Sequence, residues 1–150
     1  RITEIMDYAD KNNLDLSEYT FFSTFISKEH HFKSHYKHIM KYWKGHPHAM
    51  RRDIPKTDTP KKLLNIWNMT SRLKVWFHDS NDKLRLNLML CLNNETLEKF
   101  CNNYSIQFDP LPHKNKISME VPLDSEDLET INKKYQYYED IIEKLDFNRM

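Results

Sequence analysis

The chain has 150 residues, a formal net charge of +1 and 13% aromatic residues. This length is typical of one domain with a single core, and the aromatic content is too high for an intrinsically disordered chain. Gly45 is the only glycine in the sequence. The chain therefore lacks the glycine-rich G-x-G-x-x-G and Walker A loops, which excludes Rossmann-type and P-loop nucleotide binding.

Membrane and redox signals are also weak. No apolar run approaches the roughly 18 residues that a transmembrane helix needs, and the N-terminus does not begin as a signal peptide. Two cysteines, Cys91 and Cys101, lack metal-binding spacing. We interpret them as reduced thiols of a cytoplasmic protein that has no membrane partner. Because Arg1 is not a start residue, we allow for a longer parent chain with a covalent partner domain.

The charge is unevenly distributed along the chain. Residues 28–62 hold ten Lys/Arg against three Asp/Glu, whereas residues 120–146 hold three Lys against nine Asp/Glu. Such asymmetry is typical of a basic contact surface, or of two oppositely charged segments that neutralise each other within the fold. The sequence leaves both interpretations open.

The N-terminal 44 residues read as helical. A short helix is expected over residues 3–11, capped by Thr3. Asp15 and Glu18 resemble a capping box that opens a long second helix. This helix would end at Gly45, because glycine is typical of helix C-termini. Its apolar positions recur at spacings of three and four: Phe22, Phe25, Ile26, Phe32, Tyr36, Ile39, Met40 and Trp43.

A basic loop should follow over residues 45–62, which contain three prolines. The apolar pattern then changes to a period of two, which is typical of strands. We expect strands over residues 63–69 and 72–78, a turn at residues 79–82, and a third strand over residues 84–92. The third strand is the strongest prediction, because Leu84, Leu86, Leu88, Leu90 and Leu92 alternate without a break.

The remaining elements follow from caps and alternation. A helix should begin at Asn93 or Asn94 and end near Asn103, and two strands should contain residues 106–108 and 117–121. A final amphipathic helix should run over residues 125–145. The element order is thus ααβββαββα. It predicts an α+β fold in one domain, with an antiparallel sheet of about five strands and helices packed on it.

Histidines offer one candidate for a metal site. His31, His35 and His38 fall one turn apart on the long helix, a spacing at which imidazoles can share a transition metal. Lysines crowd this stripe, and it lacks the H-E-x-x-H pattern. We therefore expect a solvated helix face and no cofactor, and we keep a metal-dependent enzyme built on these histidines as the alternative function.

A basic surface with interleaved aromatic residues is the leading candidate for a contact site. Lysine and arginine suit phosphate contacts, and exposed aromatic rings can stack on bases. Ordinary solvated charges and a Trp76 covered by a helix would give the same pattern. The candidate residues for contact with nucleic acid or a protein partner are Lys37, Lys41, Lys44, Arg51, Arg52, Lys74 and Trp76.

Residues 21–150 resemble a bacterial domain family of unknown function in the order of their predicted elements and in several short sequence features. The matching features include Phe21-Phe22-x-x-Phe25, Ile66-Trp67, Arg72-Leu73-Lys74-Val75, Lys83-Leu84-Arg85-Leu86-Asn87-Leu88, Ile106-Gln107-Phe108-Asp109-Pro110 and Lys114-x-Lys116-Ile117. That family often follows a restriction-endonuclease-like nuclease domain. The resemblance implies an accessory role beside a nuclease, as in phage defence, and it transfers no catalytic residue. We therefore expect a non-catalytic accessory or recognition module that contacts protein or nucleic acid.

Overall fold

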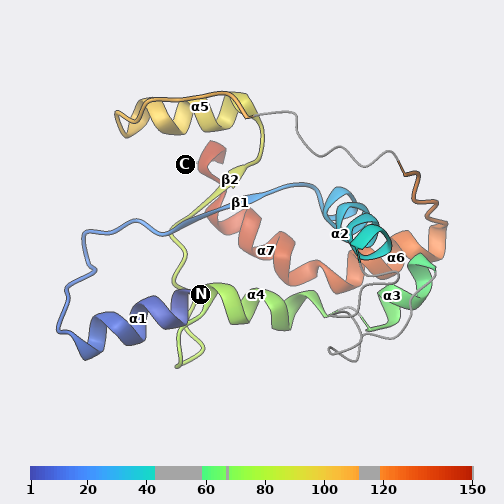
Figure 1. Cartoon of the computed structure of the whole chain (residues 1–150), viewed down its shortest axis with the longest axis horizontal. Coiled ribbons are helices and arrows are strands. Elements are labelled where there is room, and N and C mark those ends of the chain that lie inside the picture. Colours follow the sequence, from blue (N-terminus) through green and yellow to red (C-terminus); the bar gives the residue numbers. More distant parts are fainter. Residues whose placement is uncertain (43–58, 67, 112–118, 150) are drawn as a thin grey trace. The chain divides into compact units, whose positions relative to one another are not determined.

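The computed structural model describes residues 1–42, 59–66, 68–111 and 119–149. These residues form seven α-helices, two strands and one 3-10 helix (Figure 1). In chain order the elements are α1 (Ile2–Lys11), β1 (Phe22–Phe25), α2 (Lys28–Tyr42), α3 (Pro60–Ile66), α4 (Met69–Phe77), β2 (Leu88–Cys91), α5 (Asn94–Asn103), α6 (Ser125–Lys134), α7 (Gln136–Leu145) and η2 (Phe147–Arg149).

The predicted five-stranded antiparallel sheet is wrong. Within the described residues the sheet has two strands, and β1 and β2 pair in parallel with Phe22 opposite Leu88 and Phe25 opposite Cys91. The chain between them contains three described helices. Such a long connection is what parallel pairing requires, whereas antiparallel strands can be joined by a short turn.

The leucine-rich segment forms a shorter strand than its alternation predicts. Only β2 pairs with β1, and Leu88, Met89 and Leu90 are all buried. Successive side chains point to opposite faces of a strand, so β2 is covered on both faces. A strand buried on both faces suits parallel pairing rather than the half-exposed antiparallel sheet that we expected.

Two predicted strands are helices instead. Residues 63–69 lie mostly in α3, where the adjacent Leu63 and Leu64 are both buried. Residues 72–78 lie mostly in α4, where Met69 and Leu73 are buried four residues apart. The Asn68 side chain accepts from the Ser71 backbone N–H at 2.9 Å and so caps α4. This cap, together with the spacing of four, marks a helix.

The predicted long helix from residue 15 to Gly45 is also wrong at its start. Asp15 accepts from the Ser17 backbone N–H at 2.8 Å, which forms a local turn. Phe22 and Phe25 lie in β1, and the helix α2 begins at Lys28 after Ser27, whose hydroxyl accepts from the His30 backbone N–H. Aromatic residues and threonine favour strands, which explains why Phe22–Phe25 form β1 although their apolar spacing also fits a helix.

Other boundaries were predicted more closely. The helices at residues 3–11 and 94–103 are confirmed as α1 and α5, although α1 begins at Ile2 and Thr3 lies inside it. The final helix is two helices, α6 and α7, which meet at Tyr135. No strand occurs over residues 106–108 or 119–121, and residues 117 and 118 fall outside the described part of the chain, as do residues 45–58 of the expected loop.

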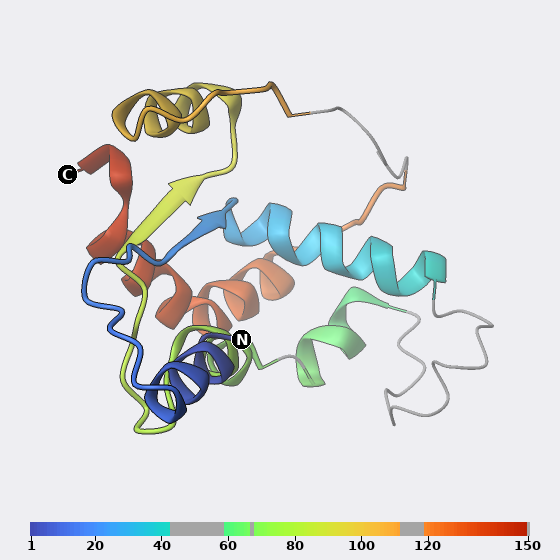
Figure 2. The same ribbon diagram turned by 60° about the vertical axis from the view of Figure 1, so that its left-hand side comes forward.

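The chain divides into two compact units. Unit 1 comprises residues 1–26, 68–112 and 137–150. Its core packs Leu88 and Leu90 of β2 against Phe100 of α5 and Phe147 of η2. The Phe100 and Phe147 rings meet edge to face, with centroids 5.6 Å apart. Figure 2 shows β1 beside β2, with α5 directly following β2. Both cysteines are free and half-buried, and Cys101 packs against this core.

Unit 2 comprises residues 27–67 and 113–136. Here α6 contacts both α2 and α3. The buried side chains of α2 are Phe32, Tyr36 and Ile39, as the helical spacing of that segment predicts. A capping box at Asp124 and Asp127 begins α6, because each side chain bonds the backbone of the other residue.

Candidate functional site

The outward face of α4 in unit 1 presents a tryptophan to solvent. Trp76 is 57% exposed and Val75 is 44% exposed. Arg72, also exposed, precedes them by three and four residues, so the three side chains share one side of the helix. Met69 and Leu73 anchor α4 in the core. An exposed tryptophan beside an arginine is the composition that dominates binding hot spots.

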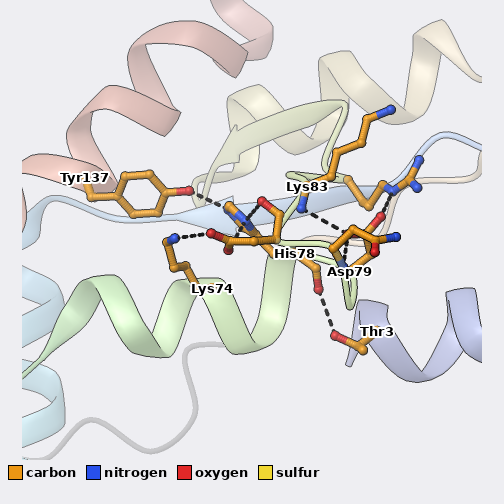
Figure 3. A network of polar contacts seen from close by, with 9 residues as sticks. Thr3, Lys74, His78, Asp79, Lys83 and Tyr137 are labelled. Carbon is orange, nitrogen blue, oxygen red and sulfur yellow. Dashed lines mark hydrogen bonds and ion pairs between the residues drawn. The ribbon is translucent and has the colours of Figure 1, made fainter.

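A buried histidine ends α4 and connects it to α7. Figure 3 shows the Tyr137 hydroxyl pointing toward the His78 ring. Its Nε2 lies 2.5 Å from the Tyr137 hydroxyl. Its Nδ1 lies 2.8 Å from the Asp82 backbone oxygen and 3.0 Å from the Asp82 carboxylate. Both groups at Nδ1 are acceptors, so in the neutral ring Nδ1 carries the proton and Nε2 accepts from Tyr137.

The backbone of the same histidine connects α4 to α1. The Thr3 hydroxyl donates to the His78 carbonyl oxygen at 2.8 Å. Thr3 was predicted as a helix cap, but its side chain holds the end of a different helix (Figure 3). The C-terminal end of α4 is therefore bound by side chains from both α1 and α7.

The buried carboxylate of Asp79 organises the turn that follows α4. Its Oδ1 accepts from the backbone N–H groups of Asn81 and Lys83, at 2.9 and 3.0 Å. Its Oδ2 accepts from Arg85 Nε at 2.6 Å. The Lys83 N–H bond, followed by the Arg85 bond, holds the pKa of Asp79 below its ordinary value of 3.8. The turn predicted at residues 79–82 is thus confirmed.

Asp82 closes the network with a special backbone conformation. Its φ is 58°, a left-handed conformation that aspartate tolerates better than most residues. The carboxylate pairs with Lys74 Nζ at 2.5 Å. The Lys74 hydrogen bond lowers the pKa of Asp82 and raises that of Lys74. Lys74 therefore contributes to the network that holds α4 and is engaged by a carboxylate of the same unit.

The order Tyr137–His78–Asp82 looks like a proton relay, but its electrostatics favour a structural role. Burial raises the pKa of Tyr137, so the phenol stays protonated at neutral pH and donates to His78. A nucleophilic tyrosine would need the opposite shift. We interpret the network as the support of α4, since it fixes the helix end from which Trp76 projects.

Lys74 and Trp76 both fall within the strand predicted over residues 72–78, where alternate residues would share a face. Residues two positions apart on a helix are separated by about 200° around its axis, so α4 places Lys74 and Trp76 on opposite sides. Of the other predicted contact residues, Lys37 and Lys41 lie on α2 in unit 2. Lys44, Arg51 and Arg52 fall outside the described residues. The described members of the predicted contact site are thus divided between the two units.

The predicted histidine stripe lies on α2. His31 Nδ1 is 3.0 Å from the hydroxyl of the fully buried Tyr135 of α6, and the two rings meet edge to face. His38 is exposed and His35 is half-buried. Throughout the described residues, no group of three or more His, Cys, Asp or Glu is arranged to hold a metal ion. The contact with Tyr135 shows that His31 packs against the end of α6.

Comparison with known proteins gives no relative: no family model matches the chain, nor does any curated protein or solved structure. The site rests on the geometry alone. Sequence reasoning missed His78, Tyr137 and the role of Asp79. The available signal was the Asp79-Ser80-Asn81-Asp82 turn, because aspartate at the start of a turn commonly bonds the backbone two residues on.

Proposed function

We propose that this chain is a non-catalytic recognition module that binds a protein partner through Arg72, Val75 and Trp76 on α4. The observation that carries the proposal is the exposure of Trp76 on a helix whose end is held by polar contacts from α1 and α7. A preorganised aromatic side chain gives binding energy with little loss of conformational entropy. The expected accessory role beside a bacterial nuclease in the cytoplasm is compatible with this proposal.

The charge of unit 1 favours protein over nucleic acid as the ligand of α4. Unit 1 carries nine Lys/Arg against fourteen Asp/Glu, a formal charge of −5. Nucleic-acid binding depends mainly on neutralising phosphates with Lys and Arg. An acidic unit with an exposed Trp76 and Val75 instead suits a partner surface that is apolar at its centre and basic at its rim.

A second candidate function belongs to unit 2, which carries fourteen Lys/Arg against eight Asp/Glu, a formal charge of +6. This charge favours contact with a nucleic-acid backbone through residues such as Lys37 and Lys41. Some of the fourteen basic side chains are engaged inside the unit, since Lys33 pairs with Glu29 and Lys61 pairs with Glu126 at 2.6 Å. We therefore place this function second.

Site-specific photo-crosslinking tests the main proposal. Benzoylphenylalanine would replace Trp76 in the whole chain, expressed in a bacterial host, and a matched variant would carry it at Tyr8, an exposed aromatic residue of α1. We expect a protein adduct that survives nuclease treatment at position 76 and not at position 8. Equal adducts at both positions, or nuclease-sensitive adducts at position 76, would contradict the proposal.

A further inference from the structure

The strand β1 has one edge that is paired and one that is open. The Phe21 and Phe25 carbonyls accept from the backbone N–H groups of Leu88 and Leu92. In parallel pairing, alternate residues of a strand face the same neighbour. The register therefore directs the backbone of Ser23 to β2, and the N–H and C=O groups of Phe22 and Thr24 to the other edge.

A side chain closes one end of this open edge. The Tyr138 hydroxyl accepts from the Ile26 backbone N–H and donates to the Ile26 carbonyl oxygen, at 3.2 and 3.0 Å. The Asn87 side chain accepts from the Phe21 backbone N–H at 2.8 Å, on the edge that pairs with β2. Burial raises the pKa of Tyr138 to about 12, so its hydroxyl remains a donor. Within the described residues, the outward groups of Phe22 and Thr24 have no such partner.

The other strand of the pair is protected. Met89 of β2 forms a bridge with Asp146 on the side away from β1. The two-stranded sheet thus has one covered edge, along β2, and one exposed edge, along β1. Phe22 is 50% exposed and Thr24 is exposed.

The sequence of β1 lacks the usual protection of an exposed edge. Proteins normally guard such edges with lysine, proline or a bulge, because unpaired backbone groups recruit other strands. Residues 20–27 contain no charged residue, proline or glycine, and they are rich in Phe and Thr. Such a segment favours strand pairing and presents no charge that would repel a second copy of itself.

We propose that two copies of this chain associate through β1, by antiparallel pairing about a two-fold axis at Ser23. Phe22 of each copy exchanges backbone hydrogen bonds with Thr24 of the other. A two-fold axis makes the same surface serve both copies, so the spacing of the two outward residues around Ser23 is self-complementary. The result is one continuous sheet of four strands. Such a sheet is more stable than an isolated pair of strands, which is only marginally stable in water.

Sedimentation velocity of the whole chain over a range of concentrations tests the self-association. We expect a reversible monomer–dimer equilibrium. Phe22→Lys places a charge on the edge, and Thr24→Pro removes an outward N–H that β2 does not use, so each should give a monomer. The control Leu14→Lys changes another exposed apolar residue of unit 1 and should remain dimeric. A wild-type protein that is monomeric at every concentration would overturn the proposal.

Disulfide trapping tests the geometry of the pairing. Ser23 of the two copies would form a non-hydrogen-bonded pair, with Cα atoms about 4.5 Å apart, within the range that disulfides span. Ser23→Cys should therefore give a covalent dimer on mild oxidation, whereas the wild type, which keeps Cys91 and Cys101, and Leu14→Cys should not. Equal crosslinking of Leu14→Cys would overturn the assigned interface. Both tests are independent of Trp76 and of the proposed protein partner.

Discussion

Unit 1 and unit 2 differ in both the sign and the use of their charges. Unit 1 has a formal charge of −5 and buries the Asp79 carboxylate among backbone N–H groups and Arg85. Unit 2 has a formal charge of +6, and its pair between Lys61 and Glu126 lies at the exposed surface. The comparison teaches that a network of charged groups determines the geometry of a turn in unit 1, whereas in unit 2, apart from the capping box that begins α6, the charged groups mainly set the surface potential.

The apolar cores should matter equally in both units. Leu90 of unit 1 is 0% exposed, and Leu64 of unit 2 is also buried. Leu90→Ala and Leu64→Ala should each lower the free energy of unfolding by about 2–5 kcal/mol, because each leaves a cavity. Chemical denaturation measures the loss. The matched control is Leu92→Ala, 43% exposed, for which a loss as large as that of Leu90→Ala would contradict the assigned burial.

The polar network of unit 1 should contribute less than the core but measurably. Tyr137→Phe removes the hydroxyl that donates to His78 Nε2 and leaves a buried acceptor without its donor. We expect a loss of roughly 1–3 kcal/mol in the free energy of unfolding. Tyr8→Phe, on the exposed surface of the same unit, is the control and should stay within about 0.5 kcal/mol of the wild type. Equal effects would show that the network does not support the fold.

Acid should weaken unit 1 through Asp79 and Asp82. Both carboxyl groups have pKa values below 3.8 in the folded chain. A carboxyl group whose pKa is lower in the folded chain stabilises the fold at pH values above its ordinary pKa. This stabilisation is lost as the pH falls through the folded pKa. Stability should therefore fall between about pH 4 and the lower folded pKa values. Asp79→Asn should flatten this dependence in thermal melts from pH 2 to 6, and an unchanged slope would contradict the assignment.

The smallest effect belongs to the exposed pairs of unit 2. Lys61→Ala should leave the melting temperature unchanged in moderate salt, because an exposed ion pair gains little and is screened. Differential scanning calorimetry of the variant beside the wild type measures this. A clear fall that disappears at high salt would show that unit 2 also depends on its charges, and the contrast between the units would fail.

A segment could be predicted from the sequence where its residues fitted only one type of secondary structure. Residues 94–103 carry a cap at Asn93 and one helical period, so that helix could be predicted from sequence. Residues 72–78 contain Leu73, Val75 and Phe77, which satisfy a period of two and a spacing of four. In the structure Leu73 is buried together with Met69, four residues before it, which is the spacing of a helix. Only tertiary packing reveals this burial, so the sequence could not distinguish the helix from a strand.

The candidate site was predictable only in part. Trp76 was a candidate contact residue whose exposure the sequence left open, and the structure shows it 57% exposed. The strand predicted over residues 72–78 would place Trp76 and Lys74 on one face, and this placement fails on a helix. The contact of His78 with Tyr137 joins residues 59 positions apart. No local pattern encodes such a contact, so the network that supports α4 could not be predicted.

Titration calorimetry with the partner captured at position 76 tests the central claim most directly. If Trp76 anchors the interface, Trp76→Ala should weaken binding by about 30-fold, which corresponds to a hot-spot loss of about 2 kcal/mol. Lys41→Ala on α2 of unit 2 should leave the dissociation constant unchanged. Binding that tolerates Trp76→Ala but is lost with Lys41→Ala would place the recognition surface in unit 2 and contradict the account.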